Sequence, residues 1–344
     1  MKKKPLIILT GPTAVGKTEL SIQLAKAIGG EIISADSMQV YKHMDIGTAK
    51  IMPEEMEGVA HFLVDELEPN EEFNVVRFKE MADKAIEGIY SRNHIPIIVG
   101  GTGFYIQAVL YDIDFTENEN DDGYRLELET IGAQNGAEYL HEMLKAVDEK
   151  SAQNIHVNNM KRVIRALEYF HQTGKPISKH NEEQMKKEST YNFIYFVLNN
   201  NRQIIYDRIN TRIDRMIENG LVDEVKKLKD MGCTKEMVSM QGLGYKELLD
   251  YLDGNIELED AIYIIKRDTR HFAKRQLTWF KRESDVVWMD YSKYNNNCDE
   301  MLNEMLSKII ENRIIENRII ENKIIENKII ENKISYKELG VYNE

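Results

Sequence analysis

The chain has 344 residues, 42% of them hydrophobic, which is enough for one large domain or for a core with an inserted subdomain. Its formal net charge of −13 argues against a protein that coats nucleic acid nonspecifically, but it leaves room for a local basic groove. Cys233 and Cys298, the two cysteines, lie far apart, so neither a disulfide framework nor a zinc pair is expected.

The N-terminal segment and the lengths of the apolar stretches indicate the cellular location of the protein. Near the N-terminus a five-residue apolar run follows several lysines, and this run is too short for a signal-peptide core. No stretch approaches the length of a membrane span. We therefore expect a cytoplasmic protein with no membrane partner, and we expect a monomer.

Short apolar runs that are typical of strands alternate with helical patterns along much of the chain. Such alternation predicts an α/β fold in which helices cover both faces of a parallel sheet. After Asn200 the chain is nearly all helical in pattern apart from Asp285–Asp290. The expected strands are Leu6–Thr10, Glu31–Ala35, His61–Val64, Ile95–Val99 and Phe193–Leu198, and Asn74–Tyr90 is the clearest intervening helix.

One segment breaks this rhythm. Residues from about Asp114 to Ser189 are charged and mostly helical in pattern, and they lie between two expected strands, so we interpret them as a helical insertion. The predicted organisation is a first part of a P-loop core (1–113), the insertion (114–190), a second part of the core with a basic helix (191–295) and a helical tail (296–344).

A glycine-rich loop links the first expected strand to a helix. The run GPTAVGKT has the spacing and the strand–helix context that a phosphate-binding loop requires, so a chance match is disfavoured. Its glycines allow inward-pointing backbone N–H groups, and the next helix adds the positive end of its dipole. Lys17 suits phosphate oxygens, and the Thr18 hydroxyl suits Mg²⁺, the one metal we expect. The predicted phosphate-binding residues are Gly11, Pro12, Thr13, Ala14, Val15, Gly16, Lys17 and Thr18.

Polar or glycine-rich segments also follow two other expected strands. Asp36 follows the second expected strand at its carboxyl end, where ligands bind in open α/β sheets, and it suits Mg²⁺ binding or general-base chemistry. A plain helix N-cap is the alternative. Gly100–Gly103 (GGTG) follows the strand Ile95–Val99, where many P-loop nucleotidases carry an Asp for Mg²⁺. This turn allows a flat or extended ligand to approach the backbone, although an ordinary strand–helix turn is the alternative.

Basic residues complete the candidate site. Arg208, Arg212 and Arg215 share one helical face by their spacing, which suits them to neutralise a leaving diphosphate, or equally to pair with acids on a solvated face. Lys266–Arg282 holds seven cations with three interleaved aromatic rings, a combination typical of RNA binding. A charged helix with a buried aromatic stripe is the alternative. Lys161–Arg165 is a second, shorter basic stretch.

The C-terminal segment Ile309–Lys333 consists of five copies of Ile-Ile-Glu-Asn-Lys/Arg. A five-residue period turns each copy by about 140° around a helix and alternates faces on a strand, so neither element gains a clean apolar side. We interpret the repeats as an extension of the last helix with no catalytic role, and an oligomerisation arm is the alternative.

Taken in order, these motifs resemble those of bacterial tRNA dimethylallyltransferases, also called isopentenyl-diphosphate:tRNA transferases. The phosphate loop alone is generic, whereas Ser34–Lys50 (SADSMQVYKHMDIGTAK) and Arg270–Phe280 (RHFAKRQLTWF) are much more specific. The resemblance extends to about Asp290, and the acidic segment 112–125 and the repeats depart from it. Further matching stretches are His61–Leu67, Val99–Tyr105, Arg162–Glu168 and Gly242–Leu248.

The resemblance implies transfer of a dimethylallyl group from dimethylallyl diphosphate to the exocyclic amine of the adenosine 3′ of the anticodon. Lys17, Thr18 with Mg²⁺, and Arg208 or Arg212 would stabilise the departing diphosphate, and Asp36 would accept the amine proton. The target base must leave the anticodon-loop stack to react. The implied contacts to the tRNA anticodon stem-loop are Asp36, Ser37, Met38, Gln39, Thr102, Arg125, Lys161, Arg162, Val163, Ile164, Arg165, Lys274, Arg275, Gln276 and Trp279.

Three other functions are compatible with parts of the sequence. A P-loop small-molecule kinase or ATPase would use Lys17, Thr18 and Asp36 equally well, but the GGTG turn and the basic helix tell against it. A tRNA-binding protein with a vestigial loop would not need those three residues. A transferase that acts on free adenine nucleotides would need neither Lys266–Arg282 nor the insertion.

Overall fold

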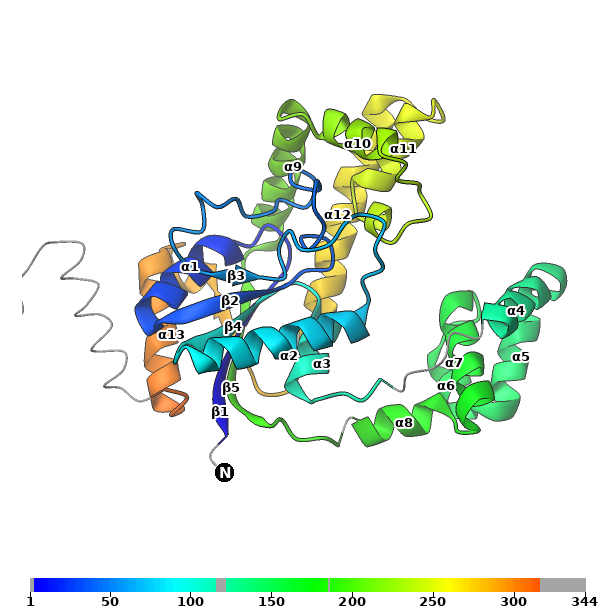
Figure 1. The fold of residues 1–344 in the computed structure, drawn as a ribbon, viewed down its shortest axis with the longest axis horizontal. Coiled ribbons are helices and arrows are strands. Elements are labelled where there is room, and N and C mark those ends of the chain that lie inside the picture. The colour runs from blue at the N-terminus through cyan, green and yellow to red at the C-terminus, as the bar shows by residue number, and fades with distance from the viewer. Residues whose placement is uncertain (1–2, 116–121, 185, 316–344) are drawn as a thin grey trace, which may run out of the picture. The chain divides into compact units, whose positions relative to one another are not determined.

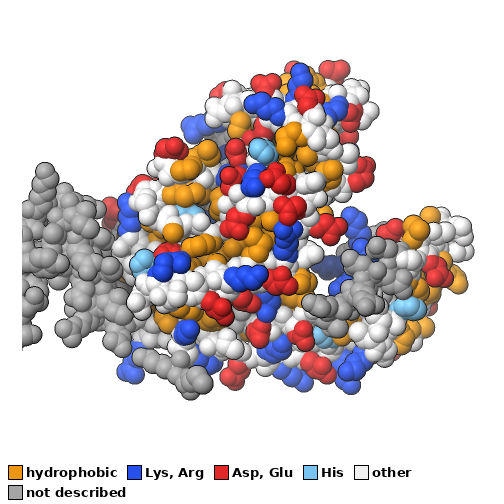
Figure 2. All heavy atoms as spheres, viewed as in Figure 1, with side chains coloured by type: hydrophobic (Ala, Val, Ile, Leu, Met, Phe, Trp, Pro, Cys, Tyr) orange, Lys and Arg blue, Asp and Glu red, His pale blue; other side chains and the backbone are white. Residues whose placement is uncertain are grey.

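The computed structural model describes residues 3–115, 122–184 and 186–315 of the chain. The chain forms two compact units: Tyr111–Ser189 makes the insertion unit, and the segments before and after it together make the core unit (Figure 1). On the face seen in Figure 2, acidic and basic side chains are interleaved rather than separated by sign. Among the helices of the described ranges, none is both long and apolar enough to cross a membrane.

The core unit contains a six-stranded parallel sheet with the order β3-β2-β4-β1-β5-β6. The α/β fold and all of the expected strands are confirmed, but the third is shorter than the predicted His61–Val64. It ends at Phe62 because Leu63 adopts a left-handed backbone conformation, with φ of 61°, that a strand does not allow. The strands are β1 (Lys4–Thr10), β2 (Gly30–Ala35), β3 (His61–Phe62), β4 (Ile95–Gly100), β5 (Tyr191–Asn199) and β6 (Val286–Asp290).

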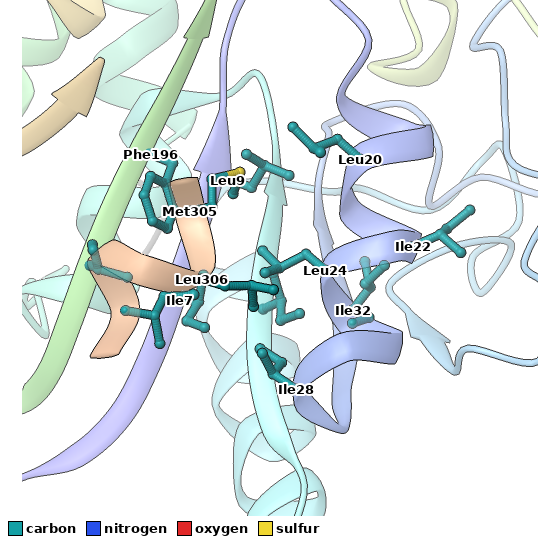
Figure 3. Packing of buried hydrophobic residues seen from close by; sticks show 14 of the residues in the cluster. Ile7, Leu9, Leu20, Ile22, Leu24, Ile28, Ile32, Phe196, Met305 and Leu306 are labelled. Atoms are coloured by element: carbon teal, nitrogen blue, oxygen red, sulfur yellow. The ribbon is translucent and has the colours of Figure 1, made fainter. Parts of the chain in front are cut away.

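Helices pack against both faces of this sheet. Successive side chains of a strand point to opposite faces, so Ile7 and Leu9 of β1 both point to the face where helices α1 and α13 pack (Figure 3). Helices α2 and α3 pack against each other, and α2 contacts β2 and β4. The helices of the core unit are α1 (Lys17–Ile28), α2 (Val75–Ser91), α3 (Gly103–Leu110), α9 (Arg202–Glu218), α10 (Leu221–Asp230), α11 (Tyr245–Leu252), α12 (Leu258–Phe280) and α13 (Cys298–Glu311).

Helix α13 is part of the core rather than a separate tail. Its residues Met301, Met305 and Ile309 are fully buried in the cluster that includes α1. The helix ends inside the first repeat, where Arg313 takes a φ of 53° and the Ile314 N–H donates back to the Ile309 carbonyl at 3.0 Å. The first copy therefore adds only Ile309–Glu311 to the last helix, which ends there instead of continuing through the repeats as predicted; residues from 316 onward lie outside the described part.

Within the described residues, the regular secondary structure of the insertion unit consists of helices alone. The unit has its own apolar core. Leu128, Leu140, Leu144 and Val163 are fully buried there. At the start of α6, the buried Asp148 carboxylate accepts hydrogen bonds from the backbone and side chains of two serines, at 2.7–2.9 Å. Burial alone would raise the pKa of Asp148, but these hydrogen bonds lower it. The helices are α4 (Asp122–Asn135), α5 (Ala137–Val147), α6 (Glu149–Asn154), α7 (Met160–Thr173) and α8 (Ile177–Gln184).

Candidate active site

The motifs singled out in the sequence meet at one edge of the parallel sheet. The glycine-rich loop follows β1, Asp36 follows β2, the GGTG turn follows β4, and α9 begins just after β5. Since all these strands run in the same direction, their carboxyl ends lie along the same edge. A hydrogen bond of 3.2 Å from the Thr102 N–H to the Ala35 carbonyl joins the GGTG turn to the end of β2.

The phosphate loop has the backbone geometry that its glycines predict. Gly16 has a φ of 109°, and a Cβ there would lie 2.8 Å from the Tyr291 hydroxyl, so a larger residue would be strained and crowded. The Lys17 ammonium donates to the carbonyls of Gly11 and Pro12 at 3.0 and 2.9 Å. Burial lowers the pKa of Lys17 to about 8, and it outweighs the opposing attraction of Asp36, while Arg212 lowers the pKa further.

Three arginines of α9 line the same cavity as Lys17, as their spacing predicted. This cavity, which we call the phosphate cavity, has a volume of about 1250 Å³. Arg208 donates to the Val15 carbonyl of the loop at 3.3 Å, and Arg215 is exposed. Burial lowers the pKa of Arg212, and the nearby Asp36 carboxylate opposes this shift. Arginine side chains of α9 therefore lie beside the loop, in a cavity whose wall also carries acidic side chains such as Asp36 and Asp207.

Asp36 has a structural contact and also faces the cavity. Its Oδ1 accepts hydrogen bonds from the backbone N–H groups of Met38 and Gln39, at 2.8 and 3.3 Å, and so holds a turn; no helix begins there, so the helix N-cap considered as the alternative is not formed. The carboxylate nevertheless lines the phosphate cavity together with Lys17 and Arg212. One oxygen thus fixes the orientation of the side chain and leaves Oδ2 for chemistry.

A second cavity, of about 320 Å³, adjoins the first, and we call it the acceptor cavity. Its walls include apolar side chains of α9 and α12, among them Ile213 and Phe272. The residues common to both cavities include Asp36 and Arg212. These two charged groups therefore stand at the junction, where a ligand in one cavity meets a ligand in the other. The complete shared set is Thr13, Asp36, Thr48, Arg212 and Met216.

The oxygen atoms of Thr18 and Asp36 can hold Mg²⁺ only together with oxygen atoms of a bound phosphate ligand. Thr18 is exposed at the start of α1 and lines the phosphate cavity with the Asp36 carboxylate. The described residues contain no cluster of three or more His, Cys, Asp or Glu side chains that would hold a metal by themselves. Mg²⁺ commonly takes one or two protein oxygens and completes its shell with water and substrate phosphates, so these residues fit the ion.

A buried carboxylate that no sequence motif indicated holds one wall of the site. Glu224 of α10 is 9% exposed, and its Oε2 accepts the backbone N–H groups of Asp45 and Ile46 at 2.9 and 2.7 Å. Its Oε1 accepts the Gly47 N–H at 3.1 Å and the Tyr245 hydroxyl at 2.7 Å. The pattern of an amphipathic helix does not show which Glu is buried. The one related signal in the sequence is that Tyr245, a partner of Glu224, lies in the matched Gly242–Leu248 block.

Helix α12 packs directly on the GGTG turn. Gln276 accepts the Thr13 N–H at 2.8 Å and donates to the Gly101 carbonyl at 3.0 Å. A Cβ at Gly101 would collide with Gln276, and one at Gly103 would collide with Trp279. These glycines therefore admit a helix of the protein itself, rather than the flat ligand that was one expectation. Gln276, predicted to bind tRNA, is 6% exposed and ties α12 to both loops.

Several predicted tRNA contacts have other roles in the structure. Val163 and Ile164 are buried in the core of the insertion unit, so their side chains do not reach an external ligand. The motif match gave no indication of which face of α7 is buried. The Gln39 amide donates to the carbonyls of Thr48 and Ala49 and thereby holds the 44–50 loop. Arg125 forms two hydrogen bonds of 2.8 Å to Glu168.

The remaining predicted contacts are accessible to a ligand. Lys161, Arg162 and Arg165 are exposed on α7. On the core unit, the acceptor cavity is lined by Ser37, Met38, Thr102 and Arg275. Lys274 is exposed on another side of α12, and Trp279 is partly buried.

Comparisons with known proteins show which family the chain resembles. Residues 39–283 match the family model described as IPP transferase. A tRNA dimethylallyltransferase of Lachnoclostridium phytofermentans is 63% identical over 308 residues, which cover 90% of this chain and 98% of that protein. A tRNA isopentenylpyrophosphate transferase structure from Bacillus halodurans is 45% identical, with a TM-score of 0.67 and coverage of 90% and 98%. A eukaryotic dimethylallyltransferase structure is 32% identical, with a TM-score of 0.77 and coverage of 91% and 81%.

Proposed function

We propose that this chain, which belongs to the IPP transferase family, moves a dimethylallyl group from dimethylallyl diphosphate to the N6 amine of the adenosine 3′ of the anticodon. Transfer of a dimethylallyl group to tRNA follows from its likeness to tRNA dimethylallyltransferases over nearly the whole chain. The position of the adenosine, the metal and the role of each residue are our inference. We further propose that the enzyme acts as a monomer in the cytoplasm.

One observation carries the assignment of roles, namely that the two cavities share Asp36 and Arg212. A diphosphate in the phosphate cavity has its allylic carbon directed toward this junction when the adenine lies in the acceptor cavity. The small-molecule kinase alternative has no observation in its favour, because the turn after β4 carries glycines that admit α12 rather than a carboxylate.

The reaction needs one bond to form and one to break. The N6 nitrogen forms a bond to the allylic carbon, the bond from that carbon to the diphosphate oxygen breaks, and diphosphate leaves. Oδ2 of Asp36 accepts the proton that the amine loses. Lys17, Arg208 and Arg212 stabilise the negative charge that gathers on the leaving diphosphate. Thr18 would hold Mg²⁺, which supplies further charge neutralisation when bound.

The test of this function is a direct transfer assay. The protein is incubated with Mg²⁺, labelled dimethylallyl diphosphate and an anticodon stem-loop that carries an adenosine 3′ of the anticodon. Label enters the RNA and is lost when that adenosine is replaced by another base. Retention of all label as the diphosphate, together with ATP turnover, would contradict the proposal and support a kinase or ATPase.

The lowered pKa of Lys17 predicts how donor binding depends on pH. Because this pKa is about 8 in the free protein, the ammonium loses its charge as the pH rises through that value. We expect the KM for dimethylallyl diphosphate to rise between pH 7 and pH 9.5, while kcat changes less because bound diphosphate restores the charged form. Initial rates over a pH series measure this effect, and a flat donor KM across the range would contradict it.

Arg275 is predicted to attract the RNA. It is exposed, lines the acceptor cavity and stacks its guanidinium on Phe272 at 5.8 Å. Arg275→Ala should weaken tRNA affinity and reduce the slope of log affinity against log salt by about one unit. Binding measured at several salt concentrations checks this, with Lys84→Ala on α2 as a control that leaves affinity unchanged. A change in donor affinity alone would show that this part of α12 is placed wrongly.

A further inference from the structure

A short turn after β6 places a buried tyrosine against the phosphate loop. Tyr291 begins a 3₁₀ helix (Tyr291–Tyr294), is 3% exposed and belongs to the apolar cluster in which α1 and α13 pack. Its hydroxyl donates a hydrogen bond of 3.3 Å to the Gly16 carbonyl, although the two residues are 275 positions apart in the sequence. The family motifs end at about Asp290, so they assign no role to this tyrosine.

The turn is attached to the sheet edge at which the candidate site lies. Asp290 ends β6, and its Oδ2 accepts a hydrogen bond of 3.0 Å from the side-chain amide of Asn199 at the end of β5. Its Oδ1 accepts the Ser292 N–H and hydroxyl at 3.0 and 2.7 Å. The residues on both sides of Tyr291 are therefore held in place, and they fix the position from which its ring extends.

The hydroxyl of Tyr291 is the donor in its bond to the loop. A carbonyl oxygen only accepts, so the hydroxyl gives its one proton to Gly16. Burial raises the pKa of Tyr291, and the hydroxyl therefore stays protonated at neutral pH. The Cys298 thiol is hydrogen-bonded to the same hydroxyl, and it acts as the donor in that bond because the hydroxyl proton is already used.

Three side chains donate to carbonyl oxygens of the phosphate loop, and one of the three is neutral. The charged pair, Lys17 and Arg208, is proposed above to bind the diphosphate, so a bound ligand competes with the loop for both. Tyr291 has no such second task, and its bond to Gly16 is kept when the cavity is filled. The donors and their carbonyls are Lys17 to Gly11 and Pro12, Arg208 to Val15, and Tyr291 to Gly16.

Holding the Gly16 carbonyl also fixes the next N–H group. In a planar trans peptide, a carbonyl and the N–H of the following residue point in opposite directions. Within the described residues, Tyr291 is not part of the wall of the phosphate cavity, so the carbonyl directed at it points away from that cavity. The N–H of Lys17, at the start of α1, then points the other way, as an anion at a helix N-terminus requires. Gly16 has a φ of 109° and no side chain, so without this bond its peptide has freedom to rotate.

We propose that Tyr291 is a positioning residue for the diphosphate of the donor. Its hydroxyl keeps the Gly16 carbonyl turned outward and so keeps the Lys17 N–H directed at a phosphate oxygen. The inference rests on the proposed function, which makes a diphosphate the occupant of the phosphate cavity. Because the hydroxyl does not touch the reacting atoms, it affects donor binding and leaves the transfer step unchanged.

Tyr291→Phe tests this role, since it removes the hydroxyl and keeps the buried ring. We expect the dissociation constant for inorganic diphosphate with Mg²⁺ to rise about fivefold, the effect of one neutral hydrogen bond. The KM for dimethylallyl diphosphate should rise by the same factor. The kcat at saturating donor and RNA, and the dissociation constant for an anticodon stem-loop, should stay within about twofold of the parental values.

Tyr90→Phe is the matched control. The Tyr90 hydroxyl of α2 donates to the Pro5 carbonyl at 2.8 Å, so this variant also loses a bond from a tyrosine to the backbone, but at the start of β1. Both variants should unfold at a lower urea concentration than the parent, whereas only Tyr291→Phe should bind diphosphate more weakly. Parental diphosphate affinity in Tyr291→Phe, or an equal loss of affinity in Tyr90→Phe, would overturn the inference. A fall in kcat at saturating donor with unchanged diphosphate affinity would overturn it too.

A second variant serves if Tyr291→Phe does not fold. Asn199→Ala keeps the hydroxyl but removes the hydrogen bond that attaches its turn to β5. We expect the dissociation constant for diphosphate to rise about twofold or more, because the turn is loosened without being lost. Parental affinity in this variant would then overturn the inference.

The two proposals fail separately. If the parental protein transfers label to RNA and Tyr291→Phe binds diphosphate as the parent does, only the role of Tyr291 is wrongly assigned. If the parental protein transfers no label, the proposed function itself is wrong.

Discussion

Asp36→Asn should lower kcat for dimethylallyl transfer by about 10²- to 10⁴-fold, the range typical for loss of a positioned general base. The amide oxygen can still accept the Met38 and Gln39 N–H groups that Oδ1 now accepts, so the turn after β2 is kept. What is lost is the oxygen that takes the amine proton at the junction of the two cavities. We therefore expect the dissociation constant for tRNA to stay within about threefold of the parental value.

Two further variants make this result specific. Asp36→Ala removes both the base and the hydrogen-bond acceptor, so transfer is abolished while tRNA binding survives. Asp207→Asn removes another carboxylate that lines the phosphate cavity, and we expect it to leave kcat nearly unchanged. Rapid-quench rates at saturating donor and RNA, with RNA affinity measured in parallel, distinguish these cases. Loss of RNA binding with normal residual chemistry would contradict the general-base role.

Glu224→Gln should destabilise the core unit by about 3 kcal/mol. The carboxylate is buried and accepts four donors from the Asp45–Gly47 loop and Tyr245, whereas an amide presents N–H groups to some of those donors. Each donor left without an acceptor costs about 1–3 kcal/mol. Because the loop also forms a wall of the phosphate cavity, we expect the KM for the donor to rise as well. Urea unfolding and donor titrations measure the two effects.

Neighbouring positions give a graded comparison for Glu224. Tyr245→Phe removes one of the four donors and should cost about 1 kcal/mol, since it leaves three hydrogen bonds in place. Asp223→Asn changes an exposed carboxylate on the same helix, and we expect a change within about 0.5 kcal/mol. If all three variants unfold at the same urea concentration as the parent, the Glu224 contacts do not stabilise the loop.

The local pattern was sufficient to predict the sheet and its edge. Each of the five apolar runs expected as strands between Leu6 and Leu198 contributes a strand to the sheet, because burial on both faces of a parallel sheet demands such runs. The glycine spacing of the phosphate loop also determined its backbone. Asp36 and Lys17 lie in one cavity because the ends of parallel strands meet at one edge.

The sequence-based expectations differed from the structure where a residue contacts a distant segment that the local sequence pattern does not identify. The repeats were expected to extend α13, yet the helix stops at Glu311 within the first copy, and Ile314 of the second copy turns back onto the core. For the glycines of the GGTG turn, close approach of a ligand and an ordinary strand–helix turn were both considered, whereas these glycines admit α12. In both cases a contact with a distant segment determined the conformation.

By itself, then, the sequence determined the α/β fold, the phosphate loop and the carboxylate at the end of β2, since each depends on apolar runs or on residues a few positions apart. Only the tertiary structure decided that Asp36 and Arg212 stand between two cavities and that Glu224 holds the Asp45–Gly47 loop. The partners in those contacts are separated by well over a hundred residues. They meet because burying the apolar faces of α9 and α10 brings these helices over the sheet edge, a gain in free energy that no short motif records.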